Sequence, residues 1–169
     1  MFSQLNFFQK SSEDTLDKTI QNANQMCKKI INDQLMHLGV DSEYRYSTKE
    51  AVEELGLDDE LVHQLVEDYV IQIIKSTLQF ENYLEKLQMS KVSNQELDFI
   101  PFRELAHKNL GVARNLRIKN AEILLYELMK KDDLDYLKVC LEALKMCSVK
   151  LKPKCAYNTL KLIKVKSSL

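Results

Sequence analysis

One twelve-residue segment decides how this chain is interpreted: Leu105-Ala106-His107-Lys108-Asn109-Leu110-Gly111-Val112-Ala113-Arg114-Asn115-Leu116. On an α-helix, positions i, i+4 and i+7 fall on one side. His107, Gly111 and Arg114 are therefore expected to form one stripe, with bare backbone between two larger side chains. A glycine inside a helix costs about 1 kcal/mol relative to alanine. Close approach of a partner molecule to His107 could offset this cost, and so could close packing between helices.

Apolar residues of the same segment predict which side of the helix faces the core. Leu105, Val112 and Leu116 lie away from the His107 stripe and are expected to point inward. Pro101 is expected in the first turn, where its missing N–H costs little. We therefore predict a helix over about 99–117 that leaves the imidazole ring of His107 pointing outward.

Helical spacing of apolar residues, together with capping signals, predicts further helices over about 13–38, 59–89, 119–131 and 134–150, a short one that runs through Leu55, and one that begins at Pro153. The expected starts are marked by Ser11-Ser12, by a capping box at Ser47-Thr48-Lys49-Glu50, by Asp58 and by Asp132-Asp133, and the expected ends by Gly39 and Gly56. The inward stripe of the 59–89 helix is predicted to be Leu61, Leu65, Tyr69, Ile73, Phe80, Leu84 and Leu87.

Composition agrees with an all-α protein. Only 3 Gly and 2 Pro occur among 169 residues, which favours long helices and few tight turns. The net charge of −1 gives no overall field that would select nucleic acid or a membrane. No stretch reaches the roughly 18 apolar residues that a spanning helix needs, and the first residues lack the features of an export signal. A cytoplasmic protein is expected.

Cysteine and histidine positions do not predict a metal site. Cys27, Cys140, Cys147 and Cys155 form no CxxC pair, and the three histidines are not at metal-ligand spacing. The simplest interpretation is four reduced thiols that fill the core. A reducing cytoplasm fits this interpretation.

The long segment around His107 resembles the signature helix of histidine phosphotransfer domains from two-component signalling. The matching residues are Ala106-His107, Gly111, Ala113 and Asn115-Leu116. The likeness covers about residues 55–150: Leu57 to Leu87 resembles the family's first long helix, Phe102 to Ala106 leads into the histidine, Lys119 to Leu128 resembles the third helix and Leu134 to Met146 the fourth. Two positions depart from the pattern. The family commonly has a lysine where this chain has Leu110, and a glycine where it has Arg117.

This resemblance implies an antiparallel four-helix bundle over residues 51–150. A preceding arm and helix, 1–50, would pack on the bundle or mediate a homodimer, and a basic helix, 151–169, would follow. Phe2, Phe7 and Phe8 could pack as an arm or belong to a tail.

The resemblance also implies a function. His107 would accept a phosphoryl group from a phospho-aspartate of a response-regulator receiver domain and pass it to another, with a hybrid histidine kinase as a further partner. An imidazole is nucleophilic when neutral, and an ordinary histidine is mostly neutral at cytoplasmic pH. The receiver would supply Mg²⁺, so the chain needs no cofactor of its own and is not an autonomous kinase. It has no nucleotide-binding glycine motif either.

Three neighbours of His107 are candidates to lie beside the phosphate: Lys108, Gly111 and Arg114. Helical side chains lean toward the N-terminus, so Arg114 could reach back over Gly111 and offer guanidinium donors in place of the lysine that Leu110 replaces. Lys108 is rotated by about 100° and can only graze the site. In the family, the missing lysine steadies the phosphate, so its absence leaves phosphoryl transfer open to question.

Other interpretations remain open at this point. A lone helical histidine is most often an ordinary surface or core residue, and an ordinary solvated arginine is the simpler interpretation of Arg114. The bundle could be a binding module that docks receiver domains without transferring phosphate, or a structural protein that dimerises through its N-terminal helix. The lysine-rich end after Glu142 fits a solvated face better than a docking surface for an acidic receiver domain, nucleic acid or anionic lipid.

Overall fold

The chain is all-helical, as predicted. The computed structural model describes the backbone of residues 2–167 and the side chains of residues 15–166. Within these residues the elements are α1 (Phe2–Gln34), the 3₁₀ helix η1 (Met36–Leu38), α2 (Lys49–Leu55), α3 (Asp59–Val92), α4 (Ile100–Asn115), α5 (Lys119–Lys130), α6 (Leu134–Leu151) and α7 (Pro153–Ser167). No strand occurs between residues 2 and 167.

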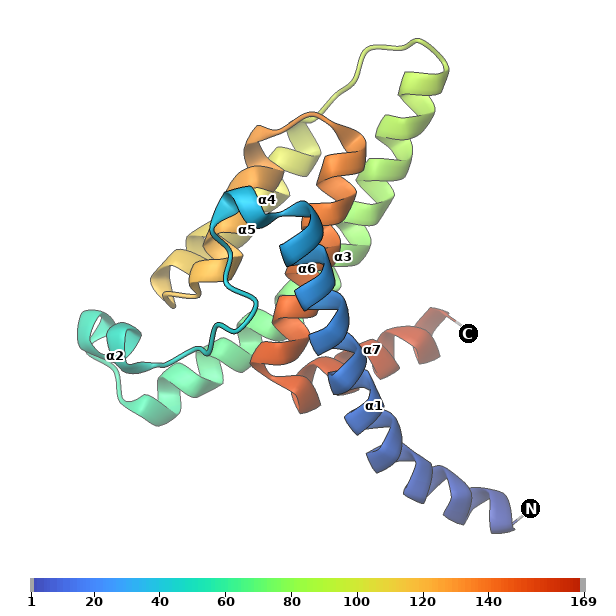
Figure 1. Cartoon of the computed structure of the whole chain (residues 1–169), viewed down its shortest axis with the longest axis vertical. Coiled ribbons are helices and arrows are strands. Elements are labelled where there is room, and N and C mark those ends of the chain that lie inside the picture. Colours follow the sequence, from blue (N-terminus) through green and yellow to red (C-terminus); the bar gives the residue numbers. More distant parts are fainter. Residues whose placement is uncertain (1, 168–169) are drawn as a thin grey trace.

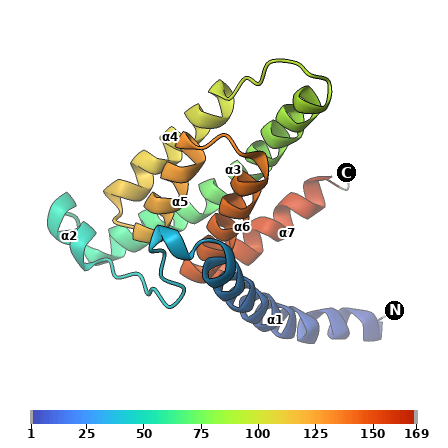
Figure 2. The same cartoon turned by 45° about the horizontal axis from the view of Figure 1, so that its top comes forward.

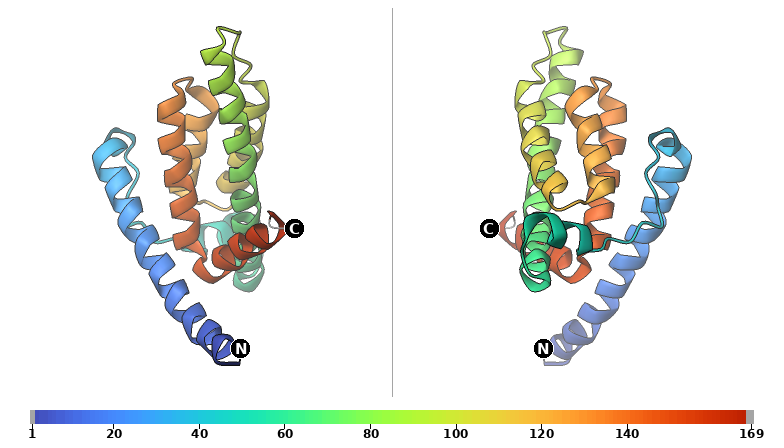
Figure 3. Two further views of the ribbon diagram at one scale, coloured as in Figure 1. Left: turned by 90° about the vertical axis from the view of Figure 1, so that its right-hand side faces the viewer. Right: turned by 90° about the vertical axis from the view of Figure 1, so that its left-hand side faces the viewer.

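Four of these helices pack side by side around a shared core. α3 packs against α4, α4 against α5, α5 against α6 and α6 against α3, and successive helices run in opposite directions (Figure 1, Figure 3). Short connections enforce this antiparallel order. At the interface between α3 and α4, the rings of Phe80 and Phe102 meet edge to face with their centroids 5.0 Å apart. Both side chains are fully buried, so this contact lies in the core.

The terminal helices pack on the outside of this group. α7 contacts α3 and α6, while α1 lies along α6 and also contacts α7 (Figure 2). Over the part of α1 whose side chains are described, the inward stripe is Ala23, Cys27 and Ile31, continued by Leu35 just after the helix, and all four are buried in the core of the same chain. That stripe is therefore already covered within one molecule. A homodimer through the first helix remains a prediction and would have to use other residues.

Local sequence signals explain most helix ends. The carboxylate of Asp58 accepts a 2.8 Å hydrogen bond from the backbone N–H of Leu61, and Asp133 caps α6 in the same way. Gly39 and Gly56 follow their helices with φ of +71° and +65°, a left-handed conformation that glycine adopts without strain. Pro101 lies in the first turn of α4, as predicted.

Three sequence predictions about the helices were wrong. α1 begins at Phe2 and not near residue 13, because residues 2–12 contain neither glycine nor proline to stop a helix. The predicted capping box before α2 does not form: Ser47 Oγ accepts from the backbone N–H of Lys49 at 3.3 Å and not from that of Glu50, and the Thr48 hydroxyl donates to the Asp59 carboxylate of α3. Leu61 is 43% exposed, because the first turns of α3 bury Val62 and Val66 instead, so the inward face lies one position further along the chain than predicted. The side chains of Phe2, Phe7 and Phe8 lie outside the described residues.

Within the described residues, each helix is either too short or too polar along its length to cross a lipid bilayer.

Candidate functional site

α4 is amphipathic, and its two faces separate sharply. The buried side chains are Phe102, Ala106, Asn109, Leu110 and Ala113. The exposed residues are Ile100, Arg103, Glu104, His107, Lys108, Gly111, Val112, Arg114 and Asn115. The structure therefore places all four predicted site residues, His107, Lys108, Gly111 and Arg114, on the solvent side of one helix.

The imidazole ring of His107 stands free on this face. Its side chain is exposed, and it makes no hydrogen bond or ion pair with any residue whose side chain the structure describes. The ring nitrogens are consequently accessible to a second molecule. Because no described residue bonds the ring, its orientation can be set by the contacts of a bound molecule.

Gly111 lies one turn after His107 and is also exposed. A Cβ atom added at this position would meet no heavy atom within 4 Å. Close packing between helices of this chain therefore does not require a glycine here, which removes one of the two explanations that the sequence allowed. Bare backbone beside the ring remains available to an approaching partner.

A buried polar contact sets the rotation of α4 about its own axis. The side-chain amide of Asn109 donates to Ser76 Oγ of α3 at 3.2 Å and to the carbonyl of Leu105 at 2.9 Å. Asn109 is almost fully buried, and it is two residues from His107, about 200° around the helix. An inward Asn109 thus directs the ring of His107 outward. The sequence argument did not identify this asparagine, because nothing local distinguishes it from a surface amide.

Leu110 occupies a core position, with only 1% of its surface exposed. The apolar side chain is stabilised by burial among its neighbours in the bundle. Its outward neighbours on α4 carry the charge instead: Arg103, Lys108 and Arg114 against a single acid, Glu104. This side of α4 is therefore positively charged, which favours contact with an acidic surface.

The guanidinium group of Arg114 makes no hydrogen bond or ion pair with any described side chain, and so does not contact His107 in this structure. Its charge acts on Glu122 at the start of α5: burial raises the pKa of that carboxyl, and the nearby Arg117 and Arg114 oppose the rise. Arg114 is thus an exposed cation on α4 that forms no ion pair with a described side chain. Arg103 differs, because its guanidinium lies over the Phe99 ring, 4.9 Å from the centroid.

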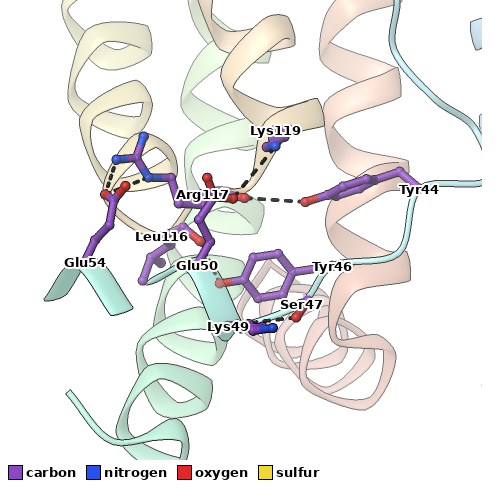
Figure 4. A network of polar contacts seen from close by, with 9 residues as sticks. All are labelled: Tyr44, Tyr46, Ser47, Lys49, Glu50, Glu54, Leu116, Arg117 and Lys119. Carbon is purple, nitrogen blue, oxygen red and sulfur yellow. Dashed lines mark hydrogen bonds and ion pairs between the residues drawn. The ribbon is translucent and has the colours of Figure 1, made fainter. Parts of the chain in front are cut away.

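The C-terminal end of α4 is held by a network that the sequence did not reveal (Figure 4). Tyr46 Oη donates a 2.6 Å hydrogen bond to the carbonyl of Leu116, and Tyr44 Oη donates to the carbonyl of Arg117 at 3.4 Å. The side chain of Arg117 is paired with the carboxylate of Glu54 in α2, with Nε 2.9 Å from Oε2. The linker before α2 and α2 itself therefore brace the turn that follows the His107 helix.

Arg117 itself has a left-handed backbone, with φ of +58°. This conformation suits glycine and costs other residues roughly 1–2 kcal/mol. The pairing with Glu54 and the hydrogen bond to its carbonyl help to hold the residue there. The backbone at position 117 is thus one that favours glycine.

One predicted orientation in the segment was wrong. Val112 was expected to face the core, but it is 40% exposed, whereas Leu116 is buried and Leu105 is half-buried. The reason is the rotation of α4 set by Asn109 and Phe102, which turns the position of Val112 to the edge of the buried face.

Two cavities lie away from this surface. The larger, of about 500 Å³, is bounded by α1, the linker before α2, α3 and α6, and the smaller by residues of η1, α5 and α6. Neither is lined by a residue of α4. The candidate site is therefore an open helix surface, and any enclosing pocket has to come from a partner. Among the described residues, no three His, Cys, Asp or Glu side chains gather as a metal-binding group.

Comparison with known proteins gave no match: no family model, no curated protein and no solved structure is similar to this chain.

Proposed function

We propose that this chain is a phosphoryl carrier of the histidine phosphotransfer type, which accepts a phosphoryl group on His107 from a response-regulator receiver domain and donates it to another. The observation that carries the proposal is the free, exposed imidazole of His107 on the outer face of an antiparallel helix group. Such a ring can enter the cleft of a partner, which a buried histidine could not do.

The transfer step uses one ring nitrogen of neutral His107. Its lone pair attacks the phosphorus of an aspartyl phosphate in line with the P–O bond to the carboxyl group. The N–P bond forms as that P–O bond breaks, and the aspartate leaves as a carboxylate. The ring, positively charged after the attack, then releases the proton of its other nitrogen to solvent. The partner's Mg²⁺, held by the carboxylates of its acidic cleft, would neutralise the charge on the phosphate oxygens.

The contacts around the ring suit this exchange. Gly111 leaves room beside His107, and Lys108 and Arg114 add positive charge near an incoming acidic cleft. Arg114 is long enough to lean toward the N-terminus of α4. We propose that it offers a charge-assisted hydrogen bond to the phosphohistidine, in place of the lysine that Leu110 replaces.

The left-handed backbone of Arg117 also supports the proposal. The family pattern has glycine at this position, and the backbone of Arg117 takes the conformation that glycine favours. A glycine at this position would adopt the same backbone without strain. The alternating directions of α3, α4, α5 and α6 also fit the proposed bundle.

The test is phosphoryl exchange with a receiver domain. The chain is mixed with receiver domains that carry labelled phospho-aspartate, and the label on the chain is assayed for stability in base and lability in acid. Wild type is expected to gain such a label and His107→Gln none, whereas the surface-histidine controls His37→Gln and His63→Gln keep it. Label that persists in His107→Gln would refute the proposal.

A second candidate function is a binding module that docks receiver domains without transfer. Buried Leu110 favours this alternative, because it leaves no cation at the position that usually steadies the phosphate. Receiver binding in calorimetry, with no label transferred from any phosphorylated receiver, would support the module. Binding together with transfer supports the carrier.

A further inference from the structure

Two cysteines that are distant in the sequence meet where α1 packs on α6. Cys27 Sγ and Cys147 Sγ lie 3.6 Å apart, within hydrogen-bonding distance for two thiols. They are 120 residues apart along the chain, so no spacing rule could have paired them. Both are free thiols, as are Cys140 and Cys155.

The two thiols differ in pKa, although either sulfur could donate the hydrogen bond between them. The hydrogen bond with Cys147, together with the charge of Lys150, lowers the pKa of Cys27 to about 7 despite its burial. The pKa of Cys147 is raised by the same hydrogen bond and by burial. Near neutral pH, the pair therefore contains a substantial fraction of thiolate, the reactive form of cysteine.

Access to the pair comes from the larger cavity. Cys147 is half-buried and lines that cavity together with Ser148 and Lys150 of α6 and Asn24 and Lys28 of α1. Cys27 is fully buried behind it. The cavity thus leads from solvent to Cys147, and the sulfur of Cys27, the thiol with the lowered pKa, lies directly behind it, 3.6 Å away.

We propose that Cys27 and Cys147 are a redox-active pair, which a hydroperoxide oxidises to a disulfide that ties α1 to α6. In the first step, one sulfur attacks a peroxide oxygen and the O–O bond breaks, giving a sulfenic acid and, with the thiol proton, one water. In the second step, the other sulfur attacks the sulfenic sulfur, and the departing hydroxyl takes the second thiol proton as water. Two thiols lose two electrons, and hydrogen peroxide gains them.

Closing the bond requires the sulfurs to approach from 3.6 Å to about 2.05 Å. Rotation of the two side chains and a small shift of α1 supply this movement. Within the described residues, α1 packs mainly along α6, so this movement acts at the interface that the disulfide would lock. The disulfide would fix the N-terminal helix against the rest of the chain. This inference is independent of the role proposed for His107.

The test treats the full chain with hydrogen peroxide, blocks the remaining thiols by alkylation and maps disulfides by mass spectrometry of unreduced peptides. The expected product is one disulfide joining the peptides of Cys27 and Cys147, reversed by dithiothreitol. Cys140→Ser and Cys155→Ser are matched controls that keep this product. Their thiols are poorer nucleophiles, since burial raises the pKa of Cys140 to about 11 and also raises that of Cys155.

Cys27→Ser and Cys147→Ser should each lose the product, with folding checked by circular dichroism. Should either variant fail to fold, the peptide map of the wild-type chain decides alone. A map that shows only sulfenic or sulfonic acids, or disulfides spread over other cysteine pairs, would overturn the proposal.

Discussion

The side-chain amide of Asn109 in α4 donates a 3.2 Å hydrogen bond to Ser76 Oγ in α3. Ser76 also accepts from the side chain of Gln72, so the buried asparagine joins a small polar network inside an otherwise apolar interface. Because Asn109 and His107 point in nearly opposite directions around α4, this contact fixes the outward direction of the candidate phosphoacceptor.

Replacing this asparagine tests the contribution of the network. Asn109→Ala is expected to lower the free energy of unfolding by about 1–3 kcal/mol, because it removes buried hydrogen bonds and leaves space behind. Urea unfolding measures this change. Asn115→Ala is the matched control on the same helix: its side chain is exposed, and a change within about 0.5 kcal/mol is expected. Equal losses in both variants would contradict the role given to Asn109.

Two substitutions of Gly111 distinguish its effect on the stability of the fold from its effect on phosphoryl transfer. Gly111→Ala should keep or raise the free energy of unfolding, by up to about 1 kcal/mol, since the new methyl group meets nothing and the helix gains propensity. Gly111→Leu should fold equally well but slow phosphoryl transfer to His107, because its side chain stands where a partner must approach. Thermal unfolding and the labelled transfer assay measure the two effects. Unimpaired transfer to the leucine variant would show that the bare backbone serves no partner.

Arg117 allows a comparison between backbone strain and ion pairing. Both Arg117→Gly and Arg117→Ala remove the contact with Glu54, but only glycine relieves the left-handed backbone. Arg117→Gly is therefore expected to be more stable than Arg117→Ala by about 1 kcal/mol. Chemical denaturation of the two variants gives this difference directly. An alanine variant as stable as the glycine variant would argue against a strained turn.

Arg114 is tested through the lifetime of the phosphohistidine. If its guanidinium contacts the phosphoryl group, Arg114→Ala should change the rate of hydrolysis by about two- to five-fold, as expected for an exposed charge contact worth roughly 0.5–1 kcal/mol. Arg103→Ala is the control, because that guanidinium is occupied on the Phe99 ring. Identical lifetimes for wild type and Arg114→Ala would remove Arg114 from the site.

The raised pKa of Tyr46 predicts that the folded chain loses stability in alkali. Burial, with the nearby Tyr44, raises the pKa of Tyr46 to about 12, above the value near 10 of an unfolded tyrosine. The stability that protonated Tyr46 contributes is complete below pH 10 and falls as the pH rises toward 12, because the unfolded chain loses its proton first. Tyr46→Phe should therefore flatten part of this fall in urea midpoints measured from pH 8 to 11. The exposed Tyr126→Phe should leave the slope unchanged.

Helix type and most helix ends could be predicted from local signals. Asp58, Asp133, Pro101 and the two left-handed glycines each act on the backbone beside them, so a reader of the sequence can place them. The start of α1 could not be placed, because the serines at 11 and 12 suggested a cap that an uninterrupted helix does not need.

What the sequence could not supply was contact between distant residues. Three hydrogen bonds join separate helices or loops: Cys27 with Cys147, Tyr46 with the carbonyl of Leu116, and Asn109 with Ser76. The spacing of apolar residues predicts which positions of a helix face the core only to within about one residue. Val112 was therefore placed in the core, and the outward direction of His107 needed the structure to establish it.

The most direct test of the central claim is to locate the phosphoryl group after exchange with a phosphorylated receiver domain. Peptide mass spectrometry under basic conditions, which preserve phosphohistidine, reads the modified residue itself. The account predicts one phosphoryl group, on the imidazole ring of His107. Phosphate found on another residue, or a chain that stays unmodified with every phosphorylated receiver that it binds, would contradict it.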